Sequence, residues 1–370
     1  MRAALVRGVR RGTTLLRDAA VYAAGAPRSG SIAVSYGLPR VPAPNEADVG
    51  GIVKLQALHR LFPHCPRRFN LLYLVTSRLP HGAASLARAA RRKGARVVVN
   101  QNGVAYPGWF GAGWERVNAP MRALLSLADH VFYQSVFCRE SADRFLGAPG
   151  GPSEILYNAV DTHRFHPAAR PPDRFTLLLG GSQDLRYRIA TALEVLALVA
   201  RERPDVQLLV TGRLRWLPDS RASRQDAERV ARDLGVLDRV VFLGPYSQTE
   251  APEIFRRAHV LLHTKYNDPC PTVVLEAMAS GLPVVYSRSG GVPELVGEDA
   301  GTGVAAKISW EHDDPPQPAA MAAAVLALSQ PDRYRAASAA ARSRAVDRFD
   351  VNPWLDRHRH VFESLVARNR

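Results

Sequence analysis

Short apolar runs of strand length alternate with helical patterns along most of this chain of 370 residues. The runs are rich in Val, Leu and Ile without polar–apolar alternation, which predicts strands that are buried on both faces and joined by crossover helices. The predicted strands are Ser31–Tyr36, Asn70–Thr76, Arg96–Asn100, His130–Gln134, Glu154–Tyr157, Phe175–Leu179, Val206–Thr211, Arg239–Leu243, His259–His263, Pro283–Tyr286 and Thr302–Ala305. The predicted helices include Gly51–Leu61, Ala83–Lys93, Phe137–Leu146, Arg188–Arg201, Ser223–Leu234 and Glu276–Ser280. This pattern is typical of doubly wound α/β architecture.

The segment His166–Arg174 is Pro-rich and polar, and strands are predicted on both sides of it. Because Pro-rich chain favours extended conformations, this segment predicts a linker between two parallel-sheet domains that face each other across a cleft. We expect an N-terminal domain at residues 1–167 and a C-terminal domain at residues 168–346. The final helix, 347–370, is expected to pack back on the first domain. Its apolar stripe consists of Trp354, His358, Val361, Phe362 and Leu365.

The three cysteines, Cys65, Cys138 and Cys270, are far apart and lack the spacing of metal ligands. They argue against a disulfide framework and a zinc site, and they favour a reducing compartment such as the cytoplasm. No run approaches the roughly 18 uncharged apolar residues that a membrane-spanning helix needs.

The formal net charge of +15 attracts phosphates, whether of nucleic acid, anionic lipid or a nucleotide ligand. A composition bias also accounts for it, and because no nucleic-acid motif accompanies the scattered arginines, we expect no nucleic-acid partner. The first 25 residues are basic and interspersed with leucines. A helix on an anionic membrane surface and a loosely packed basic tail both fit this segment, and the sequence leaves the choice open.

The segment from Val260 to Gly297 carries the clearest chemistry. A buried strand leads into the loop Thr264–Thr272, and a helix starts near Val273. The N–H groups at such a junction form an anion site, and those of Cys270, Thr272 and Val273 are candidates for holding a diphosphate. Glu276, in the first helical turn, could accept hydrogen bonds from ribose hydroxyls. A complement to the helix dipole is the simpler interpretation of that acid.

Two further features follow the same logic. Asp268 lies on the loop, where a carboxylate could stabilise positive charge developing on a sugar ring, although an Asp before Pro is also a common turn former. Gly290 and Gly291 follow the next strand and permit close approach of backbone to a ligand. Taken in this order, the acid, the acid on a helix and the Gly-Gly turn indicate a nucleotide-sugar site more strongly than any of them does alone.

The segment LEAMASGLPVV followed by SGGVPELVG resembles the signature of family 4 glycosyltransferases, which are retaining enzymes of the GT-B fold. The likeness extends upstream through LGVLDRVVFLGPYSQTEAPEIFRRAHVLL to YNAVDTHRFHP (Tyr157–Pro167), and it is specific over roughly Glu154–Gly297. The resemblance implies that Glu276 holds the donor ribose and that Asp268 lies beside the anomeric carbon. The family has Glu where this chain has Asp268, which shortens the reach by about 1.5 Å, one bond length. It also has Phe-Gly where Cys270-Pro271 stand here.

The resemblance also implies cations for the diphosphate after the first strand of the second domain. The family's Arg corresponds to Gly181 and its Lys to Arg186, with Arg188 as a second candidate. A solvated charge at a helix start is the alternative. In the first domain, Gly50 and Gly51 resemble the family's Gly-Gly loop facing donor phosphates, although glycines also occur merely at helix starts.

We therefore predict a retaining glycosyltransferase that moves a sugar from a UDP-, GDP- or similar nucleotide-sugar to a glycan, lipid-linked or other hydroxyl acceptor. The first domain is expected to bind the acceptor and the second to bind the nucleotide-sugar. Many relatives carry a His where Gln101, Asn102 and Gly103 stand, so no side chain is an obvious general base. The resemblance implies no metal and no cofactor beyond the donor. The alternatives are a nucleotide-sugar-binding subunit without transfer activity, and a sugar-nucleotide epimerase or phosphorylase of the same fold. The sequence identifies neither the donor sugar nor the acceptor, although the aromatic loop Val104–Trp114 could stack on sugar rings or cap a core.

Overall fold

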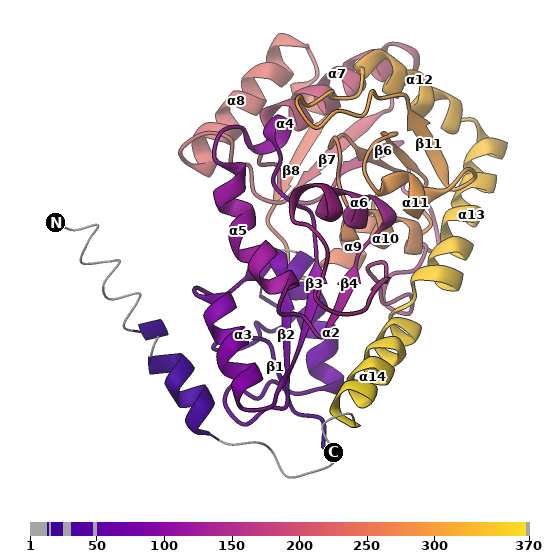
Figure 1. Cartoon of the computed structure of the whole chain (residues 1–370). Coiled ribbons are helices and arrows are strands. Elements are labelled where there is room, and N and C mark those ends of the chain that lie inside the picture. Colours follow the sequence, from indigo (N-terminus) through magenta and orange to yellow (C-terminus); the bar gives the residue numbers. More distant parts are fainter. Residues whose placement is uncertain (1–12, 15, 25–30, 47–49, 368–370) are drawn as a thin grey trace. The chain divides into compact units, whose positions relative to one another are not determined.

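The computed structural model describes residues 13–14, 16–24, 31–46 and 50–367 (Figure 1). Contacts divide the chain into two units. Among the described residues, the first unit contains residues 50–157, those up to and including Ala43, and those from Asn352 onward, and the second consists mainly of Asn158–Val351. The change from one unit to the other thus falls at Tyr157, before the Pro-rich segment that predicts the linker. That the first domain binds the acceptor and the second binds the donor stays a prediction.

A parallel five-stranded sheet forms the centre of the first unit. Its strands are β1 (Val34–Ser35), β2 (Leu71–Val75), β3 (Arg96–Gln101), β4 (His130–Tyr133) and β5 (Ser153–Ile155). Its helices are α2 (Gly50–Leu61), η1 (Thr76–Arg78), α3 (Ala83–Arg92), α4 (Pro107–Phe110), α5 (Trp114–Leu125), α6 (Val136–Phe145) and the C-terminal α14 (Val351–Ala367). Every residue of β2 is buried, as expected for a strand whose sequence does not alternate.

The second unit contains a parallel six-stranded sheet. Its strands are β6 (Thr176–Leu179), β7 (Gln207–Thr211), β8 (Val240–Gly244), β9 (Val260–His263), β10 (Val284–Ser287) and β11 (Gly301–Val304). Its helices are α7 (Arg186–Glu202), α8 (Ser220–Asp233), η2 (Leu237–Arg239), α9 (Ala251–Arg256), α10 (Thr272–Ala279), α11 (Val292–Val296), α12 (Pro318–Leu328) and α13 (Pro331–Phe349). Each strand predicted from the sequence has a counterpart in the structure.

Strand order locates the ligand-binding edge of the second sheet. The order is β11-β10-β9-β6-β7-β8, so the chain builds outward from β6 in one direction and then crosses back to β9. This is the order of dinucleotide-binding folds, in which ligands bind outside the carboxyl ends of the strands where the order reverses. In the first unit the described strands follow chain order from β1 to β5, without such a reversal.

The C-terminal helix α14 packs on the first unit through the apolar stripe read from the sequence. The rings of Phe362 and Phe62 have centroids 5.1 Å apart, and Tyr73 Oη lies 3.0 Å from His358 Nε2. Burial lowers the pKa of His358 to about 3, although a hydrogen bond to the backbone of Trp354 opposes the shift. His358 is therefore a neutral core residue.

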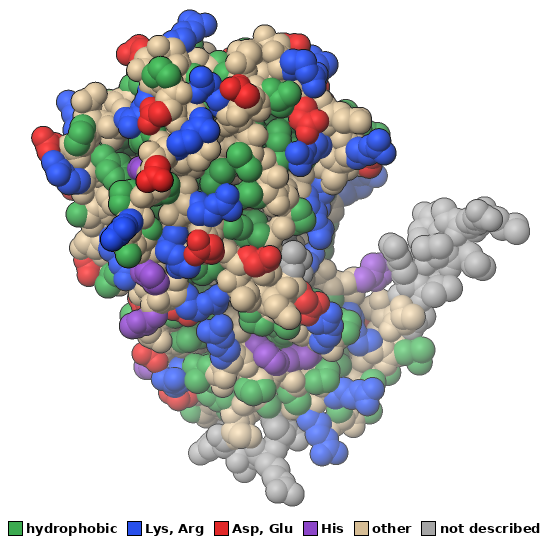
Figure 2. Space-filling model, turned by 180° about the vertical axis from the view of Figure 1, so that it is seen from behind, with side chains coloured by type: hydrophobic (Ala, Val, Ile, Leu, Met, Phe, Trp, Pro, Cys, Tyr) green, Lys and Arg blue, Asp and Glu red, His purple; other side chains and the backbone are tan. Residues whose placement is uncertain are grey.

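The N-terminal basic segment lies mostly outside the described residues. Within them, Arg17 donates to the backbone oxygen of His81 at 2.8 Å, and Leu16 and Tyr22 are exposed. None of the described helices is both long and apolar enough to cross a membrane. On the face drawn in Figure 2, basic side chains are interspersed with acidic and apolar ones. Contact with an anionic membrane stays a prediction.

Candidate functional site

The loops after β6 and β9 meet at the carboxyl edge of the second sheet, at the place where the strand order reverses. Contact is close because Gly180 lacks a side chain. A Cβ atom at Gly180 would lie 2.3 Å from Cγ2 of Val273, on the first turn of α10. The sequence therefore brings the start of α10 against the end of β6, which is the arrangement that dinucleotide sites use for phosphates.

The helix α10 begins without a side-chain cap. Its N-cap residue is Pro271, which has an extended backbone and no side-chain hydrogen bond to the first turn. Pro269 and Pro271 have no N–H to donate, so the amides of Thr272 and Val273 are the first ones of the helix. The structure thus places both predicted phosphate-binding residues at the amino end of α10.

Glu276 lies one turn further along α10 and is 3% exposed. Gln248 donates from Nε2 to its Oε1 at 3.0 Å, and Arg164 donates to the backbone oxygen of Gln248 at 2.8 Å. Burial raises the pKa of Glu276 to about 7, although the Gln248 hydrogen bond and the charge of Arg164 oppose the shift. The protein only partly offsets the cost of burying this charged carboxylate. Such a carboxylate is expected where hydroxyl groups of a ligand donate further hydrogen bonds to it.

Asp268 is partly buried, with 13% of its side chain exposed, and positively charged groups surround it. Its Oδ2 lies 3.2 Å from Lys265 Nζ and 3.4 Å from His263 Nε2. Burial alone would raise the pKa of Asp268, but Lys265, His263 and Arg188 together lower it well below its ordinary value. Asp268 is therefore ionised at neutral pH, as an acid that stabilises a developing positive charge must be.

The Gly-Gly turn packs against the backbone of the acid loop. The N–H of Gly291 donates to the carbonyl oxygen of Asp268 at 2.9 Å. Gly290 has φ +67°, and a Cβ atom there would lie 2.5 Å from the same oxygen. These glycines thus permit close approach of two protein segments, and the role predicted for them toward a donor stays a prediction.

The two candidate arginines on α7, Arg186 and Arg188, lie in different surroundings. Arg188 is 7% exposed, donates to the backbone oxygen of Ser182 at 2.8 Å, and interacts electrostatically with Asp268. Burial lowers its pKa, although Asp268, Tyr187 and Asp184 oppose the shift. Within the described part of the chain, its buried Nε has no hydrogen-bond partner. Arg188 therefore has a guanidinium whose burial is only partly compensated.

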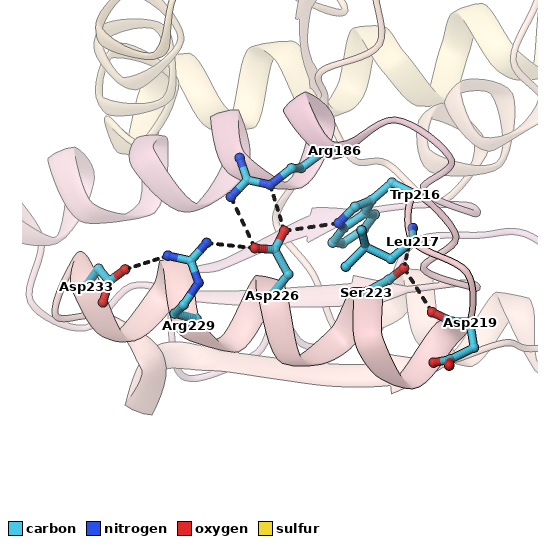
Figure 3. Close-up of polar contacts among 8 residues, drawn as sticks. All are labelled: Arg186, Trp216, Leu217, Asp219, Ser223, Asp226, Arg229 and Asp233. Carbon is cyan, nitrogen blue, oxygen red and sulfur yellow. Dashed lines mark hydrogen bonds and ion pairs between the residues drawn. The ribbon is translucent and has the colours of Figure 1, made fainter.

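Arg186 instead faces α8, as Figure 3 shows. Its Nε donates to Oδ2 of Asp226 at 2.6 Å, and its Nη2 donates to Oδ1 at 3.3 Å. Asp226 also accepts from Arg229 and from the indole of Trp216, and the hydrogen bond from Arg186 contributes most to lowering its pKa to about 2. The structure thus groups Arg188, and not Arg186, with Asp268. The role predicted for Arg186 at the diphosphate stays a prediction.

Sequence reasoning missed three contributors to this site. Gln248 is the hydrogen-bond donor to Glu276, and its place in the loop after β8, at the same edge of the sheet, is the signal that could have identified it. Lys265 and His263 contact Asp268 and were assigned no role. No group of three His, Cys, Asp or Glu side chains that could hold a metal ion is found among the described residues.

The predicted Gly-Gly loop of the first unit has an internal packing role. A Cβ atom at Gly51 would lie 2.5 Å from Ser77 Oγ in η1. Lys54, on the same helix, is 6% exposed and donates to Asn100 Oδ1 at 2.9 Å. That loop includes residues 47–49, which lie outside the described residues, and the donor contacts predicted for Gly50 and Gly51 stay a prediction.

The aromatic loop of the first unit divides into an inner and an outer part. Tyr106 is buried and stacks with Phe145, whereas Trp109 and Phe110 are 43% and 45% exposed. Trp114 is partly buried and packs edge-on against the same Phe145, with ring centroids 5.2 Å apart. The loop therefore packs Tyr106 and Trp114 against Phe145 and leaves Trp109 and Phe110 exposed.

Comparison with known proteins identifies the family. Residues 162–344 match the family model described as glycosyl transferases group 1. The second unit of the chain belongs to this family. The match confirms the resemblance to family 4 glycosyltransferases and covers the whole site of the second unit.

The chain is similar to the GDP-mannose-dependent alpha-(1-6)-phosphatidylinositol monomannoside mannosyltransferase of Mycolicibacterium smegmatis, with 29% identity over 77% of this chain and 74% of the relative. It is also 33% identical to D-inositol 3-phosphate glycosyltransferase 2 of Catenulispora acidiphila, over 42% of this chain and 39% of that one.

Two solved structures show the fold. Sucrose-phosphate synthase of Thermosynechococcus elongatus aligns with a TM-score of 0.65 and 20% identity, over 85% of this chain and 77% of that one. HepE of Anabaena, in complex with UDP and glucose, aligns with a TM-score of 0.64 and 19% identity, over 80% of this chain and 78% of that one. These likenesses, together with the two parallel sheets, confirm the predicted GT-B fold.

Proposed function

We propose that this glycosyltransferase moves a sugar from a nucleoside diphosphate sugar to a hydroxyl acceptor with retention of configuration at the anomeric carbon. The observation that supports this most is that Glu276, Arg188 and Asp268 all lie on the segments that follow β6 and β9, where the strand order of the second sheet reverses. Burial disfavours the charged forms of Glu276 and Arg188, and a bound nucleoside diphosphate would offset this cost. A ribose would offer hydroxyls to Glu276, and phosphates would offer negative charge to Arg188.

Each residue has one task in this proposal. Glu276 accepts hydrogen bonds from the ribose hydroxyls and can keep its bond from Gln248, since an ionised carboxylate has about four acceptor sites. Arg188 and the first amides of α10, at Thr272 and Val273, stabilise the diphosphate as it leaves. Asp268 stabilises the positive charge that develops on the sugar ring.

The proton needs no separate base. In a displacement on the front face, the bond from the anomeric carbon to the diphosphate breaks as the acceptor oxygen bonds to the same face. The leaving phosphate oxygen takes the acceptor's proton. This route fits a chain in which Gln101 and Asn102 stand at the place where many relatives carry a His. Because Arg188 and the α10 amides supply positive charge, we expect transfer to proceed unchanged when divalent cations are chelated.

Names of the relatives suggest where to look for substrates. The mycobacterial relative uses GDP-mannose and acts on phosphatidylinositol monomannoside, and HepE is in complex with UDP and glucose. GDP-mannose and UDP-glucose are therefore the first donors to test. A glycan, a lipid-linked sugar or another hydroxyl compound is the proposed acceptor class.

The test is a donor screen that measures nucleotide release and product formation with the wild-type protein, Glu276→Ala and Glu253→Ala. Glu253 is an exposed acid of α9, paired with Arg256, and serves as the matched control. We expect Glu276→Ala to lose donor affinity by about 10- to 100-fold, the value of hydrogen bonds to a charged group, and Glu253→Ala to keep it. Unchanged donor binding by Glu276→Ala would contradict the proposed site.

The same screen separates the alternatives. Nucleotide release without an acceptor would indicate an epimerase, and dependence on inorganic phosphate would indicate a phosphorylase. Donor binding without transfer to any acceptor in an extract would indicate a binding subunit.

A further inference from the structure

The loop that carries Asp268 has an unusual backbone. Asn267 has φ +47°, and within the described ranges it is the one residue other than glycine with a positive φ. This left-handed region favours glycine, and asparagine tolerates it better than residues with larger or branched side chains. Because Asn267 directly precedes Asp268, its backbone conformation sets the direction in which the Asp268 side chain projects from the loop.

The Gly-Gly turn holds this backbone from the other side. Ser289 Oγ accepts from the N–H of Asn267 at 2.9 Å and lies 2.9 Å from Ser287 Oγ. The N–H of Gly291 donates to the carbonyl oxygen of Asp268 at 2.9 Å. Both ends of the Asn267–Asp268 segment are therefore fixed to the turn after β10.

A third contact comes from the loop after β11. Asn267 donates from Nδ2 to the backbone oxygen of Ser309 at 3.2 Å, and Tyr266 Oη donates to the backbone oxygen of Lys307 at 2.6 Å. The side chain of Asn267 thus contributes both its tolerance of a positive φ and an anchor. Replacement by glycine would keep the first contribution and remove the second.

The carboxylate of Asp268 is held asymmetrically. The ion-pair contacts of Asp268 with Lys265 Nζ and His263 Nε2 both involve Oδ2, at 3.2 Å and 3.4 Å. Fixing Oδ2 between two groups fixes the rotation of the carboxylate. Oδ1 is then the oxygen that is oriented away from these contacts.

We propose that Asn267 and Ser289 are positioning residues that set where the Asp268 carboxylate stands, and that Lys265 selects Oδ1 as the oxygen presented to the donor sugar. This inference rests on the proposed function. It explains how a chain with Asp in place of the longer Glu can still position the carboxylate, because the backbone, and not the side chain, is adjusted. Small displacements of a catalytic group cost rate steeply.

The first experiment compares Asn267→Ala with Asn267→Gly in the full chain, using the donor found in the screen. We expect Asn267→Ala to lower kcat by about 10- to 100-fold with little change in donor KM, because the backbone before Asp268 must change. Asn267→Gly is expected to recover most of that loss. Equal kcat values for the two variants, each corrected for the fraction that binds nucleoside diphosphate, would overturn the role of Asn267.

The second experiment tests coupling to Asp268 through a double-mutant cycle. Ser289→Ala should lower kcat in the wild-type background and have little further effect in Asp268→Asn, since no carboxylate remains to be positioned. Additive losses would mean that Ser289 acts through general stability and would overturn its positioning role. In the same way, Lys265→Met should lower kcat and Lys265→Arg should restore it, and equal loss in both would overturn the role of Lys265.

The outcomes also separate this inference from the function on which it rests. If Asp268→Asn turns over as fast as the wild type, the proposed role of Asp268 fails and the inference fails with it. If Asp268→Asn is inactive while the two Asn267 variants are alike, the proposed function stands and only the inference fails.

Discussion

The two sheets of this protein treat their buried polar residues differently. In the first unit the described strands follow chain order, and the buried amine of Lys54 donates to Asn100, which also accepts from Gln134 at 3.0 Å. In the second unit the order reverses between β6 and β9, and Glu276 and Arg188 are buried with pKa values shifted toward their neutral forms. Buried polar atoms without a hydrogen-bond partner occur among the described residues of both units, for example Asn100 Nδ2 and Arg188 Nε. What distinguishes the second unit is that its buried charged groups lie at the edge of the sheet where such folds bind ligands.

The buried charged groups of the second unit therefore say more about function than those of the first unit. A buried group with a full set of partners is neutral evidence, since structural networks also bury charge. A buried guanidinium with an Nε that lacks a partner in the described structure, at the edge where such sheets bind phosphates, is evidence of a ligand. Variants that remove a charge in each unit test whether only those in the second unit change activity.

The largest effect is expected for Asp268→Asn, which keeps the size of the side chain and removes its charge. Because the carboxylate would stabilise charge that develops only in the transition state, we expect kcat to fall about 10²- to 10³-fold with donor KM nearly unchanged. The matched change in the first unit is Asp129→Asn, which removes an ion pair with Arg96. Steady-state kinetics on both variants would contradict the comparison if Asp129→Asn lost as much kcat as Asp268→Asn.

The next effect distinguishes the two arginines of α7. Arg188→Gln should weaken binding of nucleoside diphosphate by about 100-fold, since it removes a buried charge-assisted contact. Arg186→Gln should weaken it much less, because that exposed side chain already pairs with Asp226. Isothermal titration with the nucleoside diphosphate measures both. A larger loss for Arg186→Gln would restore the assignment that the sequence favours and would require the pair with Asp226 to open on binding.

This pair of arginines shows where sequence reasoning ends. Residues two positions apart on a helix do not share a face, so Arg186 and Arg188 cannot both point to the same ligand. Which of them faces the loop after β9 depends on how α7 packs on its sheet, and its spacing alone does not decide this. The packing buries Leu193, Leu196 and Val199 in the core of the second unit, whereas Arg186 lies against α8.

The strands themselves were predictable, because buried parallel strands lack alternation and stand out as apolar runs. Their order was not, since pairing is decided by contacts between distant segments. Local signals also differ from the structure at α5, where Pro120 ordinarily favours a helix break but the helix continues through it. A lone His such as His263 is usually structural, so the sequence alone predicts no role for it. Only the fold shows that the end of β9 places it against Asp268.

A smaller effect concerns the stability of the free protein. Burial raises the pKa of Glu276 to about 7, so the folded state favours the neutral acid. Stability from this group is present below its ordinary pKa and is lost as the pH rises toward and through about 7. Glu276→Gln removes the buried charge and should stabilise the free protein at pH 8 by about 1–2 kcal/mol, with little gain at pH 4.5. Urea unfolding at both pH values tests this, and an equal gain at both would show that charge is not the cause.

The smallest effect is expected in the first unit, where Trp109 and Phe110 stand in solvent. Changing both to Ala removes little buried surface, so the free energy of unfolding should change by less than about 0.5 kcal/mol. Donor affinity should stay unchanged because neither ring belongs to the second unit. Acceptor KM should rise about 10-fold if the exposed rings stack on the acceptor, since stacking on an aromatic ring contributes about 1 kcal/mol or more. A loss of donor affinity in this variant would contradict the division of tasks between the two units, whereas an unchanged acceptor KM would limit the loop to capping the core through Tyr106.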